Sequence, residues 1–334
     1  MNKRELSLAA FVTAATLTVA LLPVPAFAQQ RNAAPGPGGY PIKPVRVLVG
    51  SPAGSGSDLL MRAVAQKMTE RFGQSVIVDN RPGATGAISL QLAAQAIPDG
   101  YTLATLSAQN VTAMVFGTVT TNIQRELTAV VLMITQPYLM VATPSLPAST
   151  VKELIALAKA KPLVYASSGT GSVVHLGMEL FKSMAGVEMT HIPYKGSGLS
   201  MLDVMGGRVQ LAITNVLTAT PLVRGGKLKA LAITSGQRVQ AFPDLPTIAE
   251  AGVPGYELRS WYGLLAPNKT AAPLLAYLNR EVAAIMSAPE VKDKLSGDGA
   301  EAASPNTPAQ FSDVIARESA KWDKLIKTGV IKLQ

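Results

Sequence analysis

One pattern constrains the fold of this chain more than any other: a valine-rich run leads directly into a glycine-rich turn and then into a helix. Residues 45–49 form the run, 50–57 hold three glycines, and apolar residues recur at helical spacing over 58–72. Further elements of the same kind are expected at 75–78, 88–96 and 101–106. Strands that alternate with helices over short connections indicate a parallel α/β sheet.

The same alternation returns in the second half of the chain. Strands are expected at 136–143, 164–167, 189–193, 209–214, 228–234 and 260–266. Helices are expected at 151–160, 173–185, 200–205, 219–224, 273–287, 289–294 and 308–327. The chain therefore holds two α/β units, and its C-terminal part is mostly helical.

Two α/β units in one chain predict a two-lobed protein. Residues 136–143 and 256–266 are the expected crossings between the lobes, and the second crossing would return the chain to the first lobe. We assign 44–138 together with 262–334 to lobe 1, and 139–261 to lobe 2. Two crossings make a hinge, with a ligand cleft between the lobes.

The N-terminus carries the three parts of a secretory signal. Lys3 and Arg4 precede an apolar stretch of 14 residues, 9–22, and Ala-Phe-Ala at 26–28 is a small-x-small cleavage site. A membrane-spanning helix needs about 20 residues, so we interpret 1–28 as a cleaved signal peptide that sends the chain to the periplasm. Residues 29–43 are rich in Gly, Pro, Asn and Gln, and are expected to form a flexible arm.

Composition argues against several classes of function. The net charge is +9; Lys3, Arg4 and Glu5 contribute +1 of it, which leaves +8 for the mature chain. The Lys and Arg residues are scattered and few aromatic residues accompany them, so nucleic acid is not an expected partner. The chain has no cysteine, and no histidine or carboxylate spacing is typical of a metal site. No metal or cofactor is expected.

Ligands of open α/β sheets bind beyond the carboxyl ends of the strands. The loop 50–58 leaves a strand there and opens a helix, so free N–H groups and the positive helix end would face an anion. The candidate ligand contacts in this loop are Ser55, Gly56, Ser57 and Asp58. A plain tight turn with a helix cap is the alternative. Gly54-x-Gly56 is not a dinucleotide fingerprint, because Leu59 replaces the third glycine.

A second glycine-rich loop, 167–172, lies between a strand and a helix in the other lobe. It would face the first loop, so the two loops would offer hydrogen-bond donors to a ligand from opposite lobes. Its candidates, with the first turn of the next helix, are Ser168, Thr170, Gly171, Ser172 and His175. A third loop, 107–110, follows a strand of lobe 1 and adds Gln109 as a candidate. Further candidates, for which a purely structural role is an open alternative, are Lys195, Asn215 and Trp261 with its neighbour Tyr262.

The catalytic options are narrow, because the chain has only two histidines, His175 and His191. A hydrolase triad would combine Ser57 or Ser172 with His175 and Asp58, but the Gly-x-Ser-x-Gly elbow is absent. Acidic residues are sparse in the glycine-rich loops, which disfavours a two-carboxylate acid/base pair. We therefore expect a protein that is not an enzyme, with a periplasmic hydrolase that uses Ser172 and His175 as a remote alternative.

Seven motifs follow one another along the chain, at residues 40–46, 79–86, 98–103, 165–169, 191–196, 242–248 and 249–256. In this order they resemble the Bug (Bordetella uptake gene) family, the substrate-binding components of tripartite tricarboxylate transporters. The resemblance runs from Tyr40 to Gln334. It implies a type II-like, two-lobed periplasmic-binding-protein fold that closes on its ligand.

The resemblance also implies how the ligand is held. Family members bind one carboxylate of the solute with backbone amides and ordered waters of two glycine-rich loops, which match 52–58 and 168–172 here. The chain departs from the family at Ala53 and Ser55, where Pro and Gly are frequent, and at Thr214, where Asp is frequent. These departures concern the identity of the ligand rather than its class.

The sequence thus predicts a periplasmic solute-binding protein that captures a small carboxylate, which could be an organic acid, an amino acid or an aromatic acid. Its partners would be the membrane permease subunits of a tripartite tricarboxylate transporter, and it would act as a monomer. Asp58, where it faces the cleft, would favour a ligand that also carries an amine or hydroxyl group. A sensor subunit that presents its ligand to a membrane histidine kinase is the alternative.

Overall fold

Residues 34–117 and 122–329 are described by the computed structural model, so the predicted signal peptide 1–28 lies outside the described residues. The strands run in the order β2-β1-β3-β9-β4-β7-β5-β6, and β8 and β10 also pair with β4. Their bounds are β1 Val45–Val49, β2 Val76–Asn80, β3 Thr102–Ser107, β4 Leu127–Ala142, β5 Val164–Ser167, β6 Thr190–Pro193, β7 Leu211–Asn215, β8 Lys229–Ile233, β9 Arg259–Pro267 and β10 Glu301–Ala302.

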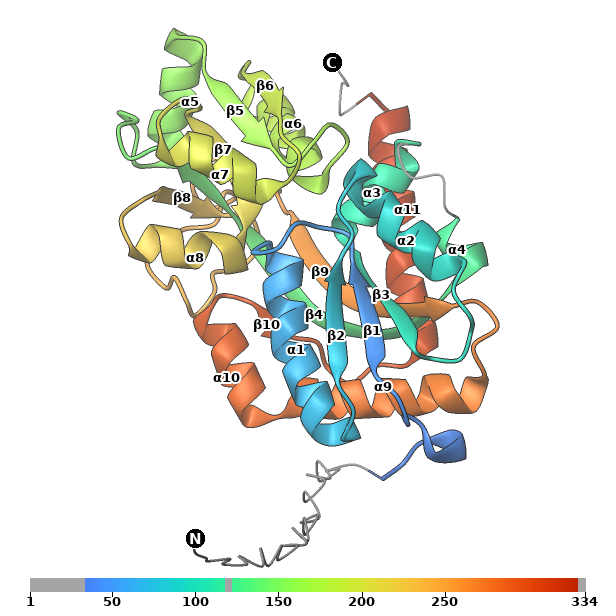
Figure 1. The fold of residues 1–334 in the computed structure, drawn as a ribbon. Coiled ribbons are helices and arrows are strands. Elements are labelled where there is room, and N and C mark those ends of the chain that lie inside the picture. Colours follow the sequence, from blue (N-terminus) through green and yellow to red (C-terminus); the bar gives the residue numbers. More distant parts are fainter. Residues whose placement is uncertain (1–33, 118–121, 330–334) are drawn as a thin grey trace, which may run out of the picture.

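Helices connect these strands and cover both faces of the sheets (Figure 1). Their bounds are α1 Gly56–Phe72, α2 Ala87–Ala94, α3 Ala108–Val115, α4 Ile123–Glu126, α5 Val151–Ala160, α6 Val173–Ala185, α7 Ser197–Met205, α8 Val216–Arg224, α9 Ala272–Ser287, α10 Pro289–Gly297 and α11 Pro308–Lys327. Short 3₁₀ turns lie at Pro37–Gly39 and Ala84–Gly86. Within the described residues, no helix combines the length and apolar character that a membrane crossing requires.

Strand β4 belongs to both halves of the molecule, as Figure 1 shows. Residues 127–137 pair antiparallel with β9, and residues 138–142 pair with β7 and β8. We call lobe 1 the part built on β2-β1-β3-β9, and lobe 2 the part built on β7, β5, β6 and β8. The predicted two-lobed α/β fold is confirmed. The assignment of 44–138 plus 262–334 and of 139–261 to the two lobes stays a proposal.

Strand alternation builds the layers of lobe 1. Val45, Val47 and Val49 face α1 and α9, while Leu48 between them faces the opposite side. There it packs in one cluster with residues of α2, α3 and α11, including the buried Phe311. Side chains of successive strand residues point to opposite faces, so a strand with a helix on each side is apolar almost throughout. This leaves its carboxyl end as the place for polar residues.

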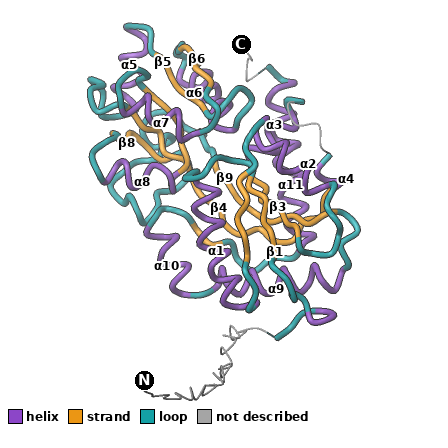
Figure 2. The backbone as a smooth tube through the Cα atoms, viewed as in Figure 1, coloured by secondary structure: helices purple, strands orange, loops and turns teal. Residues whose placement is uncertain are grey.

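Lobe 2 has the same three layers around a shorter sheet (Figure 2). Tyr165 of β5 packs with α5 and α6, and its neighbour Ala166 packs with the cluster that includes α7 and α8. Helices α6 and α7 both begin at the carboxyl ends of strands in this sheet. The lobe therefore presents helix N-termini toward lobe 1.

Two parts of the fold differ from the prediction. β4 begins at Leu127 rather than at 136, and no element was predicted for α3, α4 or β10. Residues 127–135 are buried on both faces for most of their length, so they lack the polar–apolar alternation that marks a strand. Within residues 34–43, predicted as part of a flexible arm, Tyr40, Ile42 and Lys43 instead form hydrogen bonds to residues 99–101 of lobe 1.

The anchor of this segment is Tyr40. Its side chain is buried, its hydroxyl donates to the carbonyl oxygen of Gly100 over 2.7 Å, and its ring contacts those of Phe72 and Tyr101. An aromatic side chain of this size contributes substantial apolar burial. The burial of Tyr40 therefore fixes this segment against lobe 1, although its glycine and proline content favours flexibility.

Candidate ligand-binding site

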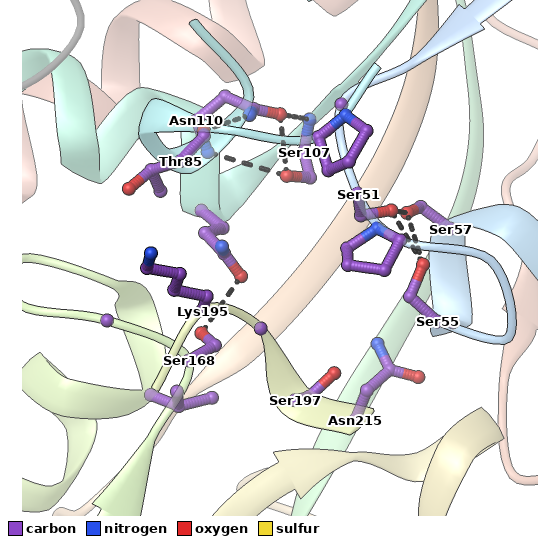
Figure 3. Close-up of a pocket in the computed structure, with 18 of the residues that line it drawn as sticks. Ser51, Ser55, Ser57, Thr85, Ser107, Asn110, Ser168, Lys195, Ser197 and Asn215 are labelled. Atoms are coloured by element: carbon purple, nitrogen blue, oxygen red, sulfur yellow. Dashed lines mark hydrogen bonds between the residues drawn. The ribbon is translucent and has the colours of Figure 1, made fainter. Parts of the chain in front are cut away.

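The two lobes enclose a cavity of about 580 Å³. It lies at the carboxyl ends of β1, β3, β5 and β7, the location predicted for a ligand in sheets of this kind. Figure 3 shows polar side chains of both lobes arranged around one open space. The volume falls within the range of small-molecule sites, about 300–1,000 Å³.

The loop after β1 forms a wall of hydroxyl groups. Ser51 Oγ lies 2.6 Å from Ser55 Oγ and 2.5 Å from Ser57 Oγ (Figure 3). Ser55 caps α1, so Gly56 and Ser57 are the first residues of the helix. The N–H groups of a first helical turn have no acceptor within the helix. This wall therefore offers hydroxyl and amide donors together.

Asp58 braces this loop from behind rather than lining the cavity. Its carboxylate is 2% exposed and accepts bonds from Gly54 N at 2.9 Å, Arg62 Nε at 3.1 Å and Asn80 Nδ2 at 2.9 Å. Asn80 Nδ2 also donates to the carbonyl oxygen of Ser51. Burial raises the pKa of Asp58, but the bonds from Arg62, Gly54 and Asn80 outweigh it and hold that pKa below its usual value.

Replacing Asp58 by asparagine is expected to lower the free energy of unfolding by about 1–3 kcal/mol at pH 7, because charge-assisted bonds to a buried group are lost. The folded-state pKa lies below the unfolded value of 3.8. The stabilisation is therefore complete above pH 3.8 and is lost as the pH falls through the lower, folded value. Urea unfolding at pH 7 and pH 3 measures both effects.

The matched control for this substitution is Asp244→Asn at an exposed position. Equal stability of Asp58→Asn and the control at pH 7 would contradict the bracing role of Asp58.

A second wall of lobe 1 comes from the turn after β2 and the start of α3. Ala84 and Thr85 have φ values of 44° and 54°, which are uncommon outside glycine. Asn110 holds this turn: its Nδ2 donates to the carbonyl oxygen of Thr85 over 2.8 Å, and its Oδ1 accepts from Ser107 N and Oγ. Strained backbone of this kind is typical of functional sites. None of the predicted ligand contacts lies in this turn.

The loop after β5 closes the cavity from lobe 2. Ser168 Oγ donates to Gln109 Oε1 of lobe 1 over 3.3 Å, so one hydrogen bond spans the cavity (Figure 3). Beside it, Phe116 at the end of α3 packs against Gly171. In the described structure the loop after β5 therefore already contacts α3 of lobe 1.

Lys195 and Asn215 complete the wall on the side of lobe 2. Lys195 lies beside the first residues of α7 and is the one cation on the cavity wall among the described residues. Asn215 caps α8: its Oδ1 accepts from Leu217 N over 2.9 Å, and its Nδ2 donates to the hydroxyl of Tyr262 over 2.9 Å. The Asn215 amide thereby links α8 to β9 across the floor of the cavity.

The structure places the thirteen predicted residues in two groups. Those on the cavity wall are Ser55, Gly56, Ser57, Gln109, Ser168, Lys195 and Asn215. Those off the wall are Asp58, Thr170, Gly171, Ser172, His175 and Trp261. Thr170 is exposed, and the other five are buried against protein partners. A role in binding stays a prediction for all thirteen.

The neighbouring residues Trp261 and Tyr262 lie on opposite sides of β9. Trp261 packs edge-on against Phe311 in the core of lobe 1, whereas Tyr262 lines the cavity. Adjacent strand residues point to opposite faces, so only one of the two can face the ligand. Which of the two residues faces the cavity could not be read from the sequence.

The pair proposed for a hydrolase is not arranged for catalysis. Ser172 Oγ accepts from the backbone N of His175 over 3.3 Å as the cap of α6, and His175 Nδ1 accepts from Gly171 N over 3.2 Å. A nucleophile needs its hydroxyl hydrogen-bonded to the base. Among the described residues, no group of three or more histidine or acidic side chains could hold a metal ion.

The electrostatic character of the cavity follows from its helices. The N-terminal ends of α1, α3, α6, α7 and α8 all contribute residues to the wall. Each helix N-terminus carries a partial charge of about +0.5. Among the described residues, the wall contains Lys195 and no Asp or Glu. The cavity is therefore suited to an anion.

Two α/β lobes around an anion-suited cleft define a solute-binding protein. The model of the tripartite tricarboxylate transporter family receptor matches residues 60–330. The chain belongs to this family, as the resemblance predicted.

Three relatives illustrate the likeness. BugT of Bordetella pertussis is 32% identical over 300 residues, which cover 88% of this chain and 92% of BugT. The structure of R. palustris Rpa4515 with adipate is 37% identical, with a TM-score of 0.84 over 87% of this chain and 99% of that one. MatC (Rpa3494) from Rhodopseudomonas palustris, with bound malate, is 28% identical, with a TM-score of 0.81 over 86% and 100%.

Proposed function

We propose that this protein is a periplasmic solute-binding protein that captures a small carboxylate between its lobes. The observation that carries the proposal is the convergence of five helix N-termini and Lys195 on a cavity whose described wall has no acidic side chain. A buried carboxylate is stabilised by several charge-assisted N–H bonds. Backbone donors at Gly56 and Ser57 would hold one carboxylate, with the hydroxyls of Ser51 and Ser55 beside them.

The ligand class follows from the relatives and from the wall. Adipate and malate, which are bound in two relatives, each carry two carboxylates. In this chain Lys195 is contributed by lobe 2, and Figure 3 shows its side chain across the open space from Ser51 and Ser55 of the loop after β1. We propose a dicarboxylate, with one end at α1 and the other at Lys195. Asp58 is not available to recognise an amine, because its carboxylate is bound to Gly54, Arg62 and Asn80.

The biological role is proposed from the family. A receptor of a tripartite transporter delivers its solute to membrane permease subunits, which would be the partners here. This role requires export, for which the N-terminal residues 1–28 have the composition. The protein would bind and release its ligand without chemistry, as a monomer.

A carboxylate panel tests the proposal. The purified protein, unfolded and refolded to remove any retained solute, is titrated with adipate, malate, citrate, benzoate and glutamate. A ligand at about 1,000 times its Kd stabilises the folded state by about 4 kcal/mol. For a protein of this size we expect the Tm to rise by about 6 °C, with binding confirmed by calorimetry.

Adipamide, which has the same chain length as adipate but no charge, is the control ligand and is expected to leave the Tm unchanged. If no carboxylate raises the Tm, or if adipamide binds as well as adipate, the proposed function is wrong.

A further inference from the structure

The ligand loop of lobe 2, defined here as residues 167–172, rests on a stack of rings. His175 and His191 lie with ring centroids 4.0 Å apart and an interplanar angle of 17°, and Tyr165 lies 5.0 Å beyond His191. Each imidazole has a hydrogen bond that ends in the ligand loop. Neither ring lines the cavity, so the proposed binding of a carboxylate does not use them directly.

His175 holds the loop through a bond that requires a neutral ring. The backbone N–H of Gly171 donates to Nδ1 of His175 over 3.2 Å. Nδ1 therefore carries a lone pair, and the ring proton is on Nε2. Gly171 has a φ of 76°, a conformation that glycine adopts without strain. Phe116 of lobe 1 packs against this residue, so the bond to His175 sets the part of the loop that meets lobe 1.

His191 makes a contact of a different kind. Its Nε2 lies 2.6 Å from Ser167 Oγ, which also accepts from Gly169 N over 3.1 Å. A ring protonated on both nitrogens can still donate from Nε2 to Ser167. Protonation of His191 is therefore compatible with its bond, whereas protonation of His175 is not compatible with the bond from Gly171.

The surroundings of the two rings contain few other charges. Lys182 Nζ donates to both oxygens of Glu179 at 3.0 and 3.1 Å, and the hydroxyl of Tyr165 donates to the same carboxylate. Glu188 lies 3.6 Å from Lys182 at the surface. Tyr256 packs on α6 through a bond from its hydroxyl to a backbone carbonyl. Helix α3, which also packs on α6, carries no charged residue.

Burial and the ammonium of Lys182 oppose a positive charge on the rings. Burial, followed by the charge of Lys182, lowers the pKa of His175 to about 4. Burial, His175 and Lys182 lower the pKa of His191 to about 4, although Glu179 acts in the opposite direction. Both rings are therefore neutral at pH 7, which agrees with the acceptor role of His175.

We propose that His175 is the positioning residue of the ligand loop in lobe 2, and that its protonation releases the loop and weakens ligand binding in acid. The imidazolium has no lone pair for the Gly171 N–H, and it would face both the stacked ring of His191 and the ammonium of Lys182. Release of the loop needs no bound ligand. Only the loss of affinity rests on the proposed function.

The size of the effect follows from proton linkage. A released, hydrated His175 would return to its ordinary pKa of 6.5, against about 4 in place. Between pH 7.5 and pH 5.0 this difference raises the equilibrium constant for loop release by about 30-fold. The released state of the loop binds the proton on His175 more tightly than the folded state does. A fall in pH therefore shifts the equilibrium toward release.

Amide hydrogen exchange measures loop release without any ligand. We expect the protection of the Gly171 N–H, corrected for the intrinsic pH dependence of exchange, to fall by about 30-fold between pH 7.5 and pH 5.0. His175→Asn places an amide oxygen near the position of Nδ1, and this acceptor does not titrate. Protection of Gly171 should then be independent of pH. Unchanged protection in the wild type would overturn the proposal.

Adipate titrations at the same two pH values test the consequence for binding. Protonation of adipate itself affects all variants equally, so the comparison is between proteins. We expect the wild type to lose about 3- to 30-fold more affinity than His175→Asn between pH 7.5 and pH 5.0. Equal losses in the two proteins would overturn the link between the loop and the ligand.

His191→Gln is the matched control, because it removes the second imidazole and retains a hydrogen-bonding partner for Ser167. The pH response of Gly171 should persist in this variant; its loss there would assign the effect to the stacked pair and overturn the role of His175. If no carboxylate binds at pH 7.5 while the exchange results hold, the proposed function fails and the positioning role stands.

Discussion

Replacing Gly56 by alanine is expected to weaken carboxylate binding by about 10- to 100-fold, which corresponds to an overpacking cost of about 1–3 kcal/mol in the closed state. A Cβ on Gly56 would lie 2.5 Å from Oδ1 and 2.7 Å from Cγ of Asn215. Asn215 cannot turn aside without loss, because its amide is bound to Leu217 N and to the hydroxyl of Tyr262. The lobes would therefore have to separate at the place where the first helix meets the ligand.

The fold itself should tolerate this change. Gly56 is the first residue of α1 and its φ is not in the left-handed region, so alanine fits the helix and lowers the entropy of the unfolded chain. Calorimetry with adipate and thermal unfolding without ligand separate the two effects. Gly198→Ala is the control, since Gly198 lies in the first turn of α7 with no heavy atom within 4 Å of an added Cβ. An affinity of Gly56→Ala equal to that of the control would contradict the close approach.

The sequence was informative about the loops because their chemistry is local. A glycine-rich segment between a strand and a helix marks the carboxyl edge of a parallel sheet, wherever the strand lies in the sheet. The loops 50–58 and 167–172 were identified in this way, and both supply residues to the wall.

The individual contacts were less predictable, because they depend on whether each side chain points into the cavity or away from it. Asp58 and Ser57 are neighbours in a helix, yet Ser57 lines the cavity and Asp58 turns back to bind Arg62 and Asn80. The partner Asn80 belongs to β2, 22 residues along the chain. The hydrogen bond between Asp58 and this distant partner leaves Ser57, and not Asp58, available to a ligand. A single sequence does not show which residues pair over such a distance.

Two of the residues that depart from the family pattern, Ser55 and Thr214, lie in different places relative to the cavity. Ser55 lies on the cavity wall and caps α1, so a change at this position alters the donors that a ligand meets. Thr214 is buried in β7 and off the wall. Its hydroxyl has no hydrogen-bond partner among the described residues. The difference at Ser55 is therefore the one that we expect to affect ligand choice.

Lys195→Met should distinguish dicarboxylates from monocarboxylates. The ammonium group is the one cation of the described wall, and a hydrogen bond to a charged group contributes about 1.5–3 kcal/mol. We expect adipate to lose about 10- to 100-fold in affinity. Hexanoate, which has the same number of carbons and one carboxylate, should lose little, because its single charge occupies the donors at α1. Calorimetry gives the first value and competition against adipate gives the second.

The control is Lys227→Met, which removes an equal charge from an exposed turn after α8, away from the wall. It accounts for the long-range effect of net charge, which salt screens beyond about 10 Å. Equal losses for adipate and hexanoate in Lys195→Met would mean that the lysine attracts any anion without binding the second carboxylate. In that case the ligand would be held from the α1 end alone, and helix N-termini rather than Lys195 would set the preference for its charge.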